Sequence, residues 1–470
     1  MIQQAAHFEA LQAHLNAGDL LRPEDGLEAY EHPARGPEGR AACVLRPRSA
    51  EQVSGILSYC IRNQLPLVVQ SGHTGLVNDG TPDMSGEQMV LSLAKLRETF
   101  DYNPVNRSLR VSAGFRLSEI NARLEEHGVF LPIDLGADPM VGGLAATNTG
   151  GSRLLRYGGV RKQVLALQVA LASAEAPLVN LGSHCRKDNS APDWKQVFIG
   201  SGAVFGVITE CTFELSRRPL AQEAALLAPR DDAAIDEILM ALEARMGSRL
   251  SAFESMSMPA VRHALNHVPG LRAPFSSGEL PEQILLVEVS QDWPEMEGTP
   301  SLNEQLMSVI EEIWSLPSAP LLDARFGNHS DMWALRHTIS EGLRAAGDIV
   351  AFDLSFSRDR VNAFRQTARE QAAIRFPMLE LCDFGHVGDG GVHLNFVAPR
   401  GAVDSALRRE IEDWAYRLAV ETFDGSFSAE HGIGRKNQRV YDAYAPEAVK
   451  TLSRQFKATV APGQIGSFKP

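Results

Sequence analysis

The sequence predicts an α+β protein built from two modules, and two patterns support that fold class. Through about Arg218, short apolar strands alternate with helices. From Leu220 onward, helices separate strands that would form an antiparallel sheet covered by helices on one side. We place the first module at 1–218 and the second at 219–422. The segment 423–470 is expected to return to the first module.

The first module opens with a helix that Ser49 should cap. Gln52 stands three residues later and would complete a capping box, and Val53, Ile56 and Leu57 fall on one face of the helix. An apolar strand at 65–69 follows. Further strands are expected at 89–93, 109–113 and 165–172. A helix at 117–127 should end at Gly128, because glycine readily adopts the left-handed conformation found at helix ends.

The second module should hold longer helices and its own strands. Strands are expected at 284–289 and 392–397, and a Pro/Gly-rich loop at 268–281. The helices predicted by apolar periodicity are 231–246, 302–314, 360–376 and 403–422, with one more at 446–457 in the C-terminal segment.

Composition narrows the range of partners. The chain has 470 residues and a formal net charge of −13, which argues against nucleic acid or an anionic membrane surface as a partner. No run is long and apolar enough to span a bilayer, and the first 21 residues contain Glu9 and Asp19 without a basic flank. We therefore expect a cytoplasmic protein. Its five cysteines are scattered, which indicates reduced thiols rather than an iron–sulfur cluster.

Two glycine-rich segments in the first module predict a nucleotide site. One covers 70–76, directly after the strand at 65–69, and the other covers 141–153 with four glycines among small and hydroxyl residues. Without side chains in the way, backbone N–H groups can approach a pyrophosphate closely. Either segment alone is typical of an ordinary turn, so the prediction depends on both together.

The histidines of the second module predict a metal site. In the strand at 392–397, His393 and Asn395 share one face, because side chains alternate along a strand. His386 lies on the glycine-rich turn before that strand, and Glu430 with His431 would complete a His/His/Glu set. The alternative is a glycine-rich hairpin whose two histidines only make hydrogen bonds. The glycine-rich segments favour the functional interpretation, since they indicate a cofactor independently.

Together these motifs resemble the FAD-linked D-2-hydroxy-acid dehydrogenases of the vanillyl-alcohol-oxidase-like flavoprotein superfamily. The resemblance covers nearly the whole chain. It is carried by Pro47 with Val53, by both glycine-rich segments, by the histidine segments, and by the motifs at 132–137, 186–189 and 198–201. The resemblance implies a two-subdomain FAD-binding module of the vanillyl-alcohol-oxidase (PCMH) type with an α+β cap domain.

The resemblance also implies cofactors and the residues that hold them. FAD would lie in the first module with its pyrophosphate on both glycine-rich segments. Better-studied members hold a divalent metal, often zinc, beside the flavin, and the matching ligands are His386, His393 and Glu430. The FAD-binding residues implied are Ser71, Gly72, His73, Thr74, Gly75, Leu76, Pro132, Gly142, Gly143, Ala145, Thr147, Asn148, Gly150, Gly151, Tyr157, Gly158 and Ile208.

Placing a 2-hydroxy acid among these groups suggests a reaction. The metal would lower the pKa of the 2-hydroxyl, the imidazole of His431 would take its proton, and hydride would pass from C2 to flavin N5. Asn395 would hold a substrate oxygen. Arg336 resembles the family's carboxylate-binding arginine, with Ser340 four positions on where dicarboxylate-specific members have threonine. The alternative for Arg336 is a charge on the exposed face of a helix.

Two departures from the family pattern bear on substrate and acceptor. Ala351 stands where dicarboxylate-specific members have a lysine. A second carboxylate would be costly to bury without a cation, so we expect a monocarboxylic substrate, or a diacid held by Arg325 or Arg344. The family's usual Ser-Glu-Gly-Thr run near the flavin is Ser-Gly-Ala-Val at 201–204 in this chain. The loss of a carboxylate and a hydroxyl leaves the identity of the electron acceptor open. An electron-transfer flavoprotein, a quinone or a cytochrome would each serve, and a homodimer is also left open.

Three alternatives remain at this point. A flavin oxidase that uses O₂ has no motif of its own. A flavin-free metal hydrolase would need His386, His393 and Glu430 but neither glycine-rich segment. Finally, His73 stands where the family more often has asparagine, and covalent flavoproteins of the wider superfamily carry their flavin-linked histidine in a similar turn. The third alternative is therefore a covalent bond from His73 to the flavin 8α-methyl, as opposed to a histidine that only hydrogen-bonds the loop or a phosphate.

Overall fold

A computed structural model describes residues 2–275 and 281–470. They divide into two compact units. The first unit comprises the chain up to Gly150, Gly158–Arg217 and Glu430–Pro470, and the second comprises Gly151–Tyr157 and Arg218–Ala429. Residues 276–280 of the predicted Pro/Gly-rich loop lie outside the described part. Within that part, no helix is both long and apolar enough to cross a membrane.

The first unit contains two main sheets and a two-stranded one. The first sheet has the order β1-β2-β4-β3 with β2, β3 and β4 parallel, the second is antiparallel with the order β5-β6-β10-β8-β9, and β11 pairs with β7. The strands are β1 Leu20–Leu21, β2 Cys43–Leu45, β3 Leu67–Gln70, β4 Met89–Ser92, β5 Phe100–Asn103, β6 Ser108–Ser112, β7 Val129–Phe130, β8 Val164–Leu171, β9 Leu178–Gly182, β10 Gly206–Glu214 and β11 Ser216–Arg217.

Short helices cover these sheets. The α-helices are α1 Ile2–Gln12, α2 Glu28–Glu31, α3 Ala50–Arg62, α4 Leu117–Leu124, α5 Val141–Thr147, α7 Val160–Gln163, α8 Lys195–Phe198, α15 Gln438–Tyr444 and α16 Glu447–Val460. The 3₁₀ turns are η1 Pro23–Asp25, η2 Leu93–Lys95 and η3 Glu125–His127. As predicted, the helix that starts at Leu117 stops before Gly128, which is left-handed with φ 64°.

The predicted helix at Ser49 forms, but its capping box is incomplete. Ser49 Oγ accepts from the Gln52 backbone N–H at 3.2 Å. The Gln52 side chain reaches past Ser49 and accepts from the Arg48 backbone N–H at 2.7 Å. The side of α3 that carries Val53, Ile56 and Leu57 is buried as expected.

The segment at 141–153 is not a loop throughout, as the sequence suggested. Val141–Thr147 forms α5, because Leu144 and Ala145 are buried in the core of the first unit while Gly142 packs against Ala113. Asn148 then ends the helix in the left-handed conformation, with φ 53°.

The C-terminal segment packs within the first unit. Ile465 forms a parallel bridge with Leu67 at the end of β3. Lys457 of α16 donates to the carbonyl oxygens of Val204 and Gly463. Burial lowers the pKa of Lys457 to about 8. The last helix is therefore tied to the loop at 201–204, where this chain departs from the family pattern.

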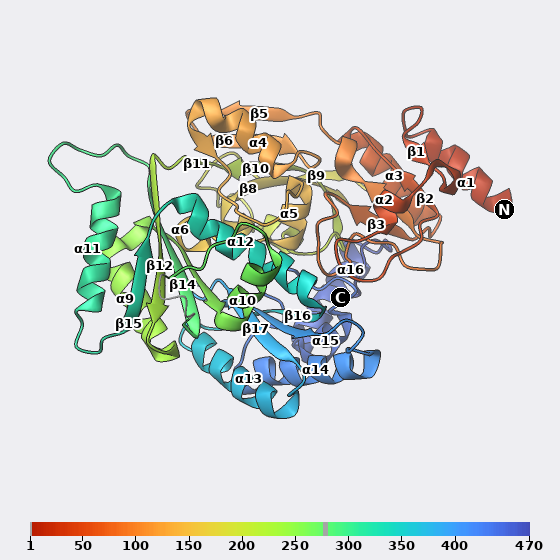
Figure 1. Ribbon diagram of the computed structural model, residues 1–470. Coiled ribbons are helices and arrows are strands. Elements are labelled where there is room, and N and C mark those ends of the chain that lie inside the picture. The colour runs from red at the N-terminus through yellow and green to blue at the C-terminus, as the bar shows by residue number, and fades with distance from the viewer. Residues whose placement is uncertain (1, 276–280) are drawn as a thin grey trace. The chain divides into compact units, whose positions relative to one another are not determined.

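One seven-stranded antiparallel sheet organises the second unit (Figure 1). Its order is β15-β12-β14-β13-β17-β18-β16, so the hairpin β17–β18 lies toward one edge. The strands are β12 Ala221–Pro229, β13 Leu250–Ser257, β14 Gln283–Gln291, β15 Leu321–Phe326, β16 Asp348–Ser355, β17 Glu380–Gly385 and β18 Gly391–Ala398. The predicted strand that carries His393 and Asn395 is confirmed as β18.

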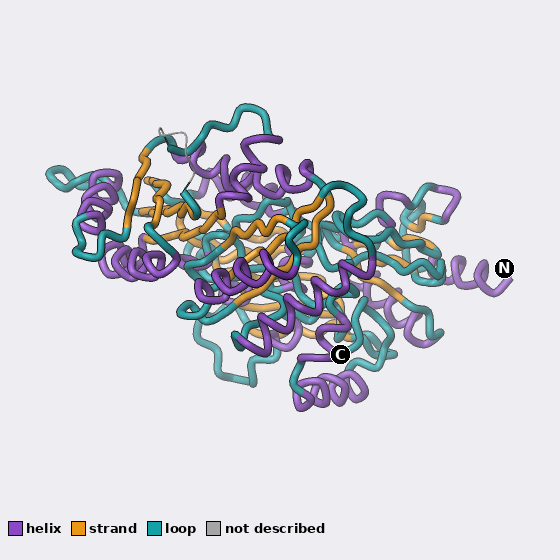
Figure 2. The backbone as a smooth tube through the Cα atoms, turned by 60° about the horizontal axis from the view of Figure 1, so that its bottom comes forward, coloured by secondary structure: helices purple, strands orange, loops and turns teal. Residues whose placement is uncertain are grey.

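Helices cover this sheet on both faces, not on one side as expected. One core cluster joins α10 and α12 to alternate strand residues such as Leu226 and Leu286. The adjacent residues Leu227 on β12 and Leu285 on β14 point to the opposite face of the sheet and are also fully buried. α9 and α11 both contact β12, and α11 also contacts β14. Both views show helices beside the sheet strands (Figures 1 and 2). α13 contacts β17, and α14 contacts β16 (Figure 1). The helices are α6 Leu154–Tyr157, α9 Asp232–Met246, α10 Met258–His267, α11 Leu302–Trp314, α12 His329–Ala346, α13 Val361–Arg375 and α14 Ser405–Arg417, with η4 Gly247–Arg249 and a π turn η5 Leu418–Thr422.

Candidate active site

The two glycine-rich segments of the first unit lie side by side. A Cβ atom built on Gly143 would stand 3.2 Å from the Ser71 Cβ, and one built on Gly72 would stand 2.9 Å from the Met140 backbone nitrogen. A side chain at Gly72 would therefore force the Met140 backbone to shift, and one at Gly143 would crowd Ser71.

Polar groups in these segments fit a phosphate-bearing ligand. Ser71 Oγ is buried and has no hydrogen-bond partner among the residues that the structure describes, so a donor is available at the meeting point of the two segments. Thr147 Oγ1 is already engaged with the Gly143 carbonyl at 2.9 Å and with Thr149 Oγ1 at 2.8 Å. An orphaned hydroxyl beside a glycine cradle is compatible with the pyrophosphate of FAD.

His73 is held within its own turn. Its backbone is left-handed, with φ 54°, and its Nε2 lies 3.1 Å from Thr81 Oγ1. Burial lowers the pKa of His73, although a backbone hydrogen bond at Ala29 raises it in part. A neutral ring is thus favoured here. The flavin link through His73 stays a prediction.

The other cofactor residues implied by the resemblance divide between the units. Gly151 and Tyr157 belong to the second unit, and the rest belong to the first. In the first unit, Thr74, Gly75, Leu76, Thr147, Asn148 and Gly158 are half-buried, while Pro132, Gly142, Ala145, Gly150 and Ile208 are buried.

The predicted metal histidines meet in the hairpin of the second unit. His386 follows β17 on the turn, and His393 lies on β18, with ring centroids 5.3 Å apart and ring planes at 81°. His386 Nδ1 lies 2.6 Å from Glu254 Oε1. His393 Nδ1 lies 3.5 Å from Asp353 Oδ1. A carboxylate hydrogen-bonded to Nδ1 is the arrangement that directs Nε2 toward a metal, and His386 has it with Glu254.

Glu254 is a candidate site residue that the sequence reasoning missed. It lies on β13 and is fully buried, and its second oxygen accepts from Arg336 Nε at 2.7 Å. Burial by itself would raise the pKa of Glu254, but His386 and Arg336 lower it to about 2. One ionised carboxylate therefore contacts both a predicted metal histidine and the predicted substrate arginine.

Arg336 is not the surface charge of the alternative interpretation. It is buried on α12, and its guanidinium lies 4.8 Å from the centre of the Phe384 ring. Among the described residues, only its Nε has a hydrogen-bond partner, so both Nη groups can still donate to a carboxylate. Ser340 is exposed one helical turn further along α12.

Asn395 is buried and its amide is partly committed. Its Nδ2 donates to the carbonyl oxygens of Cys382 at 3.3 Å and His393 at 3.1 Å. These bonds fix the amide on the side of β18 that also carries His393, which agrees with the predicted alternation.

A second buried carboxylate, Glu288 on β14, was also missed. It accepts from Arg153 Nε at 3.1 Å and from Trp333 Nε1 at 2.8 Å, and lies 2.7 Å from His329 Nε2. Burial would raise the pKa of Glu288, but the bonds from His329 and Arg153 lower it to about 2. Glu288 thereby anchors the segment 151–157, which includes Tyr157. For both glutamates, the signal in the sequence was the one charged residue within a buried strand.

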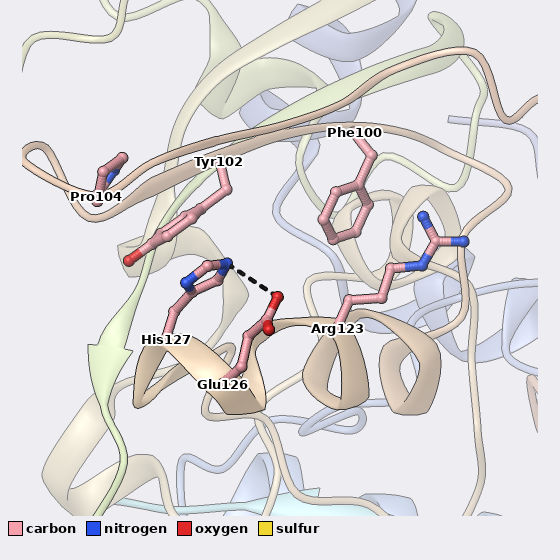
Figure 3. Close-up of a pocket in the computed structure, with 6 residues that line it drawn as sticks. All are labelled: Phe100, Tyr102, Pro104, Arg123, Glu126 and His127. Carbon is pink, nitrogen blue, oxygen red and sulfur yellow. Dashed lines mark ion pairs between the residues drawn. The ribbon is translucent and has the colours of Figure 1, made fainter.

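The first unit also contains a surface hollow. Phe100, Tyr102, Pro104, Arg123, Glu126 and His127 line it (Figure 3). Tyr102 stacks on His127 with ring centroids 4.7 Å apart, and the Arg123 guanidinium lies 4.9 Å from the Phe100 ring centre. These lining side chains contact one another, and none of them is a predicted site residue.

Comparisons with known proteins identify the family of the chain. Residues 41–176 match the model for an FAD binding domain, and residues 224–465 match that for the C-terminal domain of FAD linked oxidases. D-2-hydroxyglutarate dehydrogenase from Bos taurus is 32% identical over 442 residues, covering 93% of this chain and 78% of the bovine protein. The enzyme of that name from Xanthomonas citri pv. viticola is 31% identical, covering 83% of this chain and 80% of its own.

The fold has known counterparts as well. A crystal structure of p-cresol methylhydroxylase with substrate bound superposes with a TM-score of 0.73 over 97% of this chain and 94% of the other, at 14% identity. The predicted fold, a PCMH-type FAD-binding module with an α+β cap, is confirmed. The chain therefore belongs to the FAD-linked D-2-hydroxy-acid dehydrogenases.

Proposed function

We propose that this protein oxidises a D-2-hydroxy acid to the 2-oxo acid, with FAD and a divalent cation, zinc by preference, bound at the candidate site. The observation that carries the proposal is Glu254, which holds His386 at 2.6 Å and Arg336 at 2.7 Å. Bound FAD would supply the hydride acceptor at N5, and the cation would supply Lewis acidity at the 2-hydroxyl.

The chemistry of the donor set supports a cation held by His386, His393 and Glu430. Two imidazoles and one carboxylate suit zinc, and an open position is left for substrate. With Nδ1 of His386 beside Glu254 and Nδ1 of His393 beside Asp353, Nε2 is the nitrogen that each ring would offer.

Chain connectivity supports the roles of Glu430 and His431. The Ala429 backbone N–H donates to the Asp353 carbonyl at 3.1 Å, and Asp353 stands opposite His393 in the sheet. Glu430 is the next residue after Ala429. In the proposed reaction, the His431 imidazole accepts the proton of the substrate 2-hydroxyl.

Arg336 and Asn395 would bind the acid itself. The two Nη groups of Arg336 donate to the substrate carboxylate in a bidentate pair, while Glu254 keeps the guanidinium in place. Asn395 and Ser340 would position substrate oxygens, as the resemblance implies.

The preferred substrate is proposed to be monocarboxylic, such as D-lactate or a longer 2-hydroxy acid. Ala351 lies directly opposite Asn395 in the sheet and supplies no cation. Arg325 Nη1 already donates to the carbonyl oxygens of Ala273 at 2.9 Å and Pro274 at 2.8 Å. The names of the relatives point instead to 2-hydroxyglutarate, so a diacid would need Arg344 or Arg325 to rearrange.

Reduced FAD would return its electrons to an external acceptor, for which an electron-transfer flavoprotein, a quinone or a cytochrome is chemically suitable. Transfer to O₂ would instead make the protein an oxidase. We propose a cytoplasmic enzyme, with a homodimer as the assembly to test.

The test is anaerobic mixing of the purified holoprotein with D-lactate, longer D-2-hydroxy acids and D-2-hydroxyglutarate, while flavin absorbance is followed. One of them should bleach the flavin. His431→Gln should keep FAD and zinc but slow bleaching about 1000-fold, whereas the matched exposed substitution His127→Gln should not. Normal bleaching by His431→Gln would remove its role as base, and a partial loss would indicate a positioning role. A protein without flavin would refute the whole proposal.

A further inference from the structure

A second cluster of metal-ligating side chains lies in the second unit, on α10 and β17. His263 lies on α10, and Glu380 and Cys382 are two residues apart on β17, so they share one side of that strand. One ligating atom from each of the three residues lies within 4.8 Å of the other two. None of these residues belongs to the candidate active site.

The contacts within this cluster leave donors unused. His263 Nε2 lies 2.7 Å from Glu380 Oε2, and Arg262 Nη1 lies 3.2 Å from the other oxygen of Glu380. The second ring nitrogen of His263, Nδ1, is buried and has no hydrogen-bond partner in the described part of the chain. Cys382 is fully buried beneath them. A simple ion pair accounts for the contact between His263 and Glu380, but it gives no role to the thiol beside them.

The donor types select a class of ligand. Imidazole, carboxylate and thiolate together suit zinc, whereas magnesium and calcium prefer oxygen ligands. A thiolate and a carboxylate would neutralise the charge of a divalent ion. Arg262 would continue to pair with the Glu380 oxygen that is not bound to the metal.

We propose that His263, Glu380 and Cys382 bind a structural zinc ion, distinct from the cation of the active site. On binding, the Cys382 thiol loses its proton to solvent and a zinc–sulfur bond forms, with no change in oxidation state. Glu380 Oε2 exchanges its contact with His263 for one with the metal. His267, exposed on α10 and stacked on the His263 ring at 6.0 Å, or a water molecule takes the fourth position.

The ion would fasten α10 to β17 at a point that matters for the active site. Phe384, two residues after Cys382 on the same strand, lies under the Arg336 guanidinium, and β17 leads directly to His386. The Cys382 carbonyl also accepts from Asn395 Nδ2. Fixing β17 thus helps to hold three of the residues proposed to bind substrate and cation.

Burial opposes metal binding in one respect. The pKa of the Cys382 thiol is raised by burial, and further by the neighbouring Glu380 and Asp383. Zinc must therefore displace a tightly held proton, so binding strengthens as pH rises.

Zinc X-ray absorption of the zinc-loaded holoprotein tests this proposal, because the proposed active-site ligands contain no sulfur. The His393→Ala variant, which disables the active-site cation, should retain one zinc per chain with a sulfur neighbour at about 2.3 Å. In the His393→Ala background, Cys382→Ser should remove both the sulfur neighbour and the zinc. In the same background, His263→Gln, at a less buried residue, should weaken zinc binding at least tenfold.

Cys43→Ser provides the matched control, since Cys43 is equally buried but lies in the first unit. It should leave the sulfur signal unchanged. A zinc-loaded wild type without a sulfur neighbour, or a sulfur signal that survives Cys382→Ser, would overturn the proposal. Either outcome is independent of whether D-2-hydroxy acids bleach the flavin.

Discussion

The two units prepare their ligand sites in opposite ways. In the first unit, glycines clear space so that backbone groups and one orphaned hydroxyl, Ser71 Oγ, can meet a cofactor. In the second, buried carboxylates hold functional side chains in fixed positions, with Glu254 orienting His386 and Arg336, and Glu288 orienting Arg153. The first site depends on the absence of side chains, whereas the second depends on charges that are costly to bury unless they are paired.

Among the changes that compare the two units, the largest effect is expected from removing the charge at Glu254. Glu254→Gln should lower zinc affinity and kcat/KM by up to about 100-fold, because His386 and Arg336 lose their common anchor. Equilibrium dialysis with zinc and steady-state kinetics measure the two losses.

Glu288→Gln is the matched control for this change, since Glu288 is equally buried on the neighbouring strand. It should leave zinc affinity within about twofold. Equal zinc loss in both variants would mean that Glu254 acts only through general stability of the sheet.

A side chain in the glycine-rich segments should affect FAD binding in the first unit and leave the zinc site unchanged. Gly143→Val should weaken FAD binding roughly tenfold or more, because its side chain would overlap the Ser71 Cβ region. Titration of the apoprotein with FAD measures this, and zinc content should not change. Gly136→Val is the control, since no atom lies within 4 Å of the position that its Cβ would take. A lower zinc content in Gly143→Val would contradict the division of roles.

Restoring a cation at Ala351 should change substrate preference. Ala351→Lys should raise the ratio of kcat/KM for D-2-hydroxyglutarate to that for D-lactate about tenfold, since a charged hydrogen bond to the second carboxylate becomes available. Ala351→Met adds bulk without charge and should not raise the ratio. If wild type already strongly prefers the diacid, even after Arg325→Ala and Arg344→Ala, the argument from Ala351 fails.

The last prediction concerns stability in acid and is expected to affect turnover least. Because the folded pKa of Glu288 is lowered to about 2 from 4.5, its stabilisation is complete above about pH 4.5 and is lost as pH falls toward 2. Glu288→Gln should therefore reduce the free energy of unfolding by about 3 kcal/mol at neutral pH. That difference should shrink below pH 4.5. Denaturant unfolding at several pH values measures it, and a difference that stays constant down to pH 2 would contradict the assignment.

Much of the fold follows from local patterns. Apolar periodicity predicted the cores of α3, α9, α11, α13 and β18, because one-sided burial leaves a period of 3.6 or 2 in the sequence. It missed α10, which carries His263, and it treated Val141–Thr147 as loop. In that segment, burial of Leu144 and Ala145 outweighs the low helix propensity of two glycines.

By itself the sequence identified the family, and it located the glycine-rich segments and the candidate metal histidines, since spacing along the chain records them directly. Only the tertiary structure decided that Glu254, from a strand over 130 residues before His386, meets it at 2.6 Å. It also decided that Cys382 lies beside His263. Such partners are set by strand order and register in the sheet, which depend on long-range packing and leave no local pattern beyond a charged or sulfur-bearing residue within a buried strand.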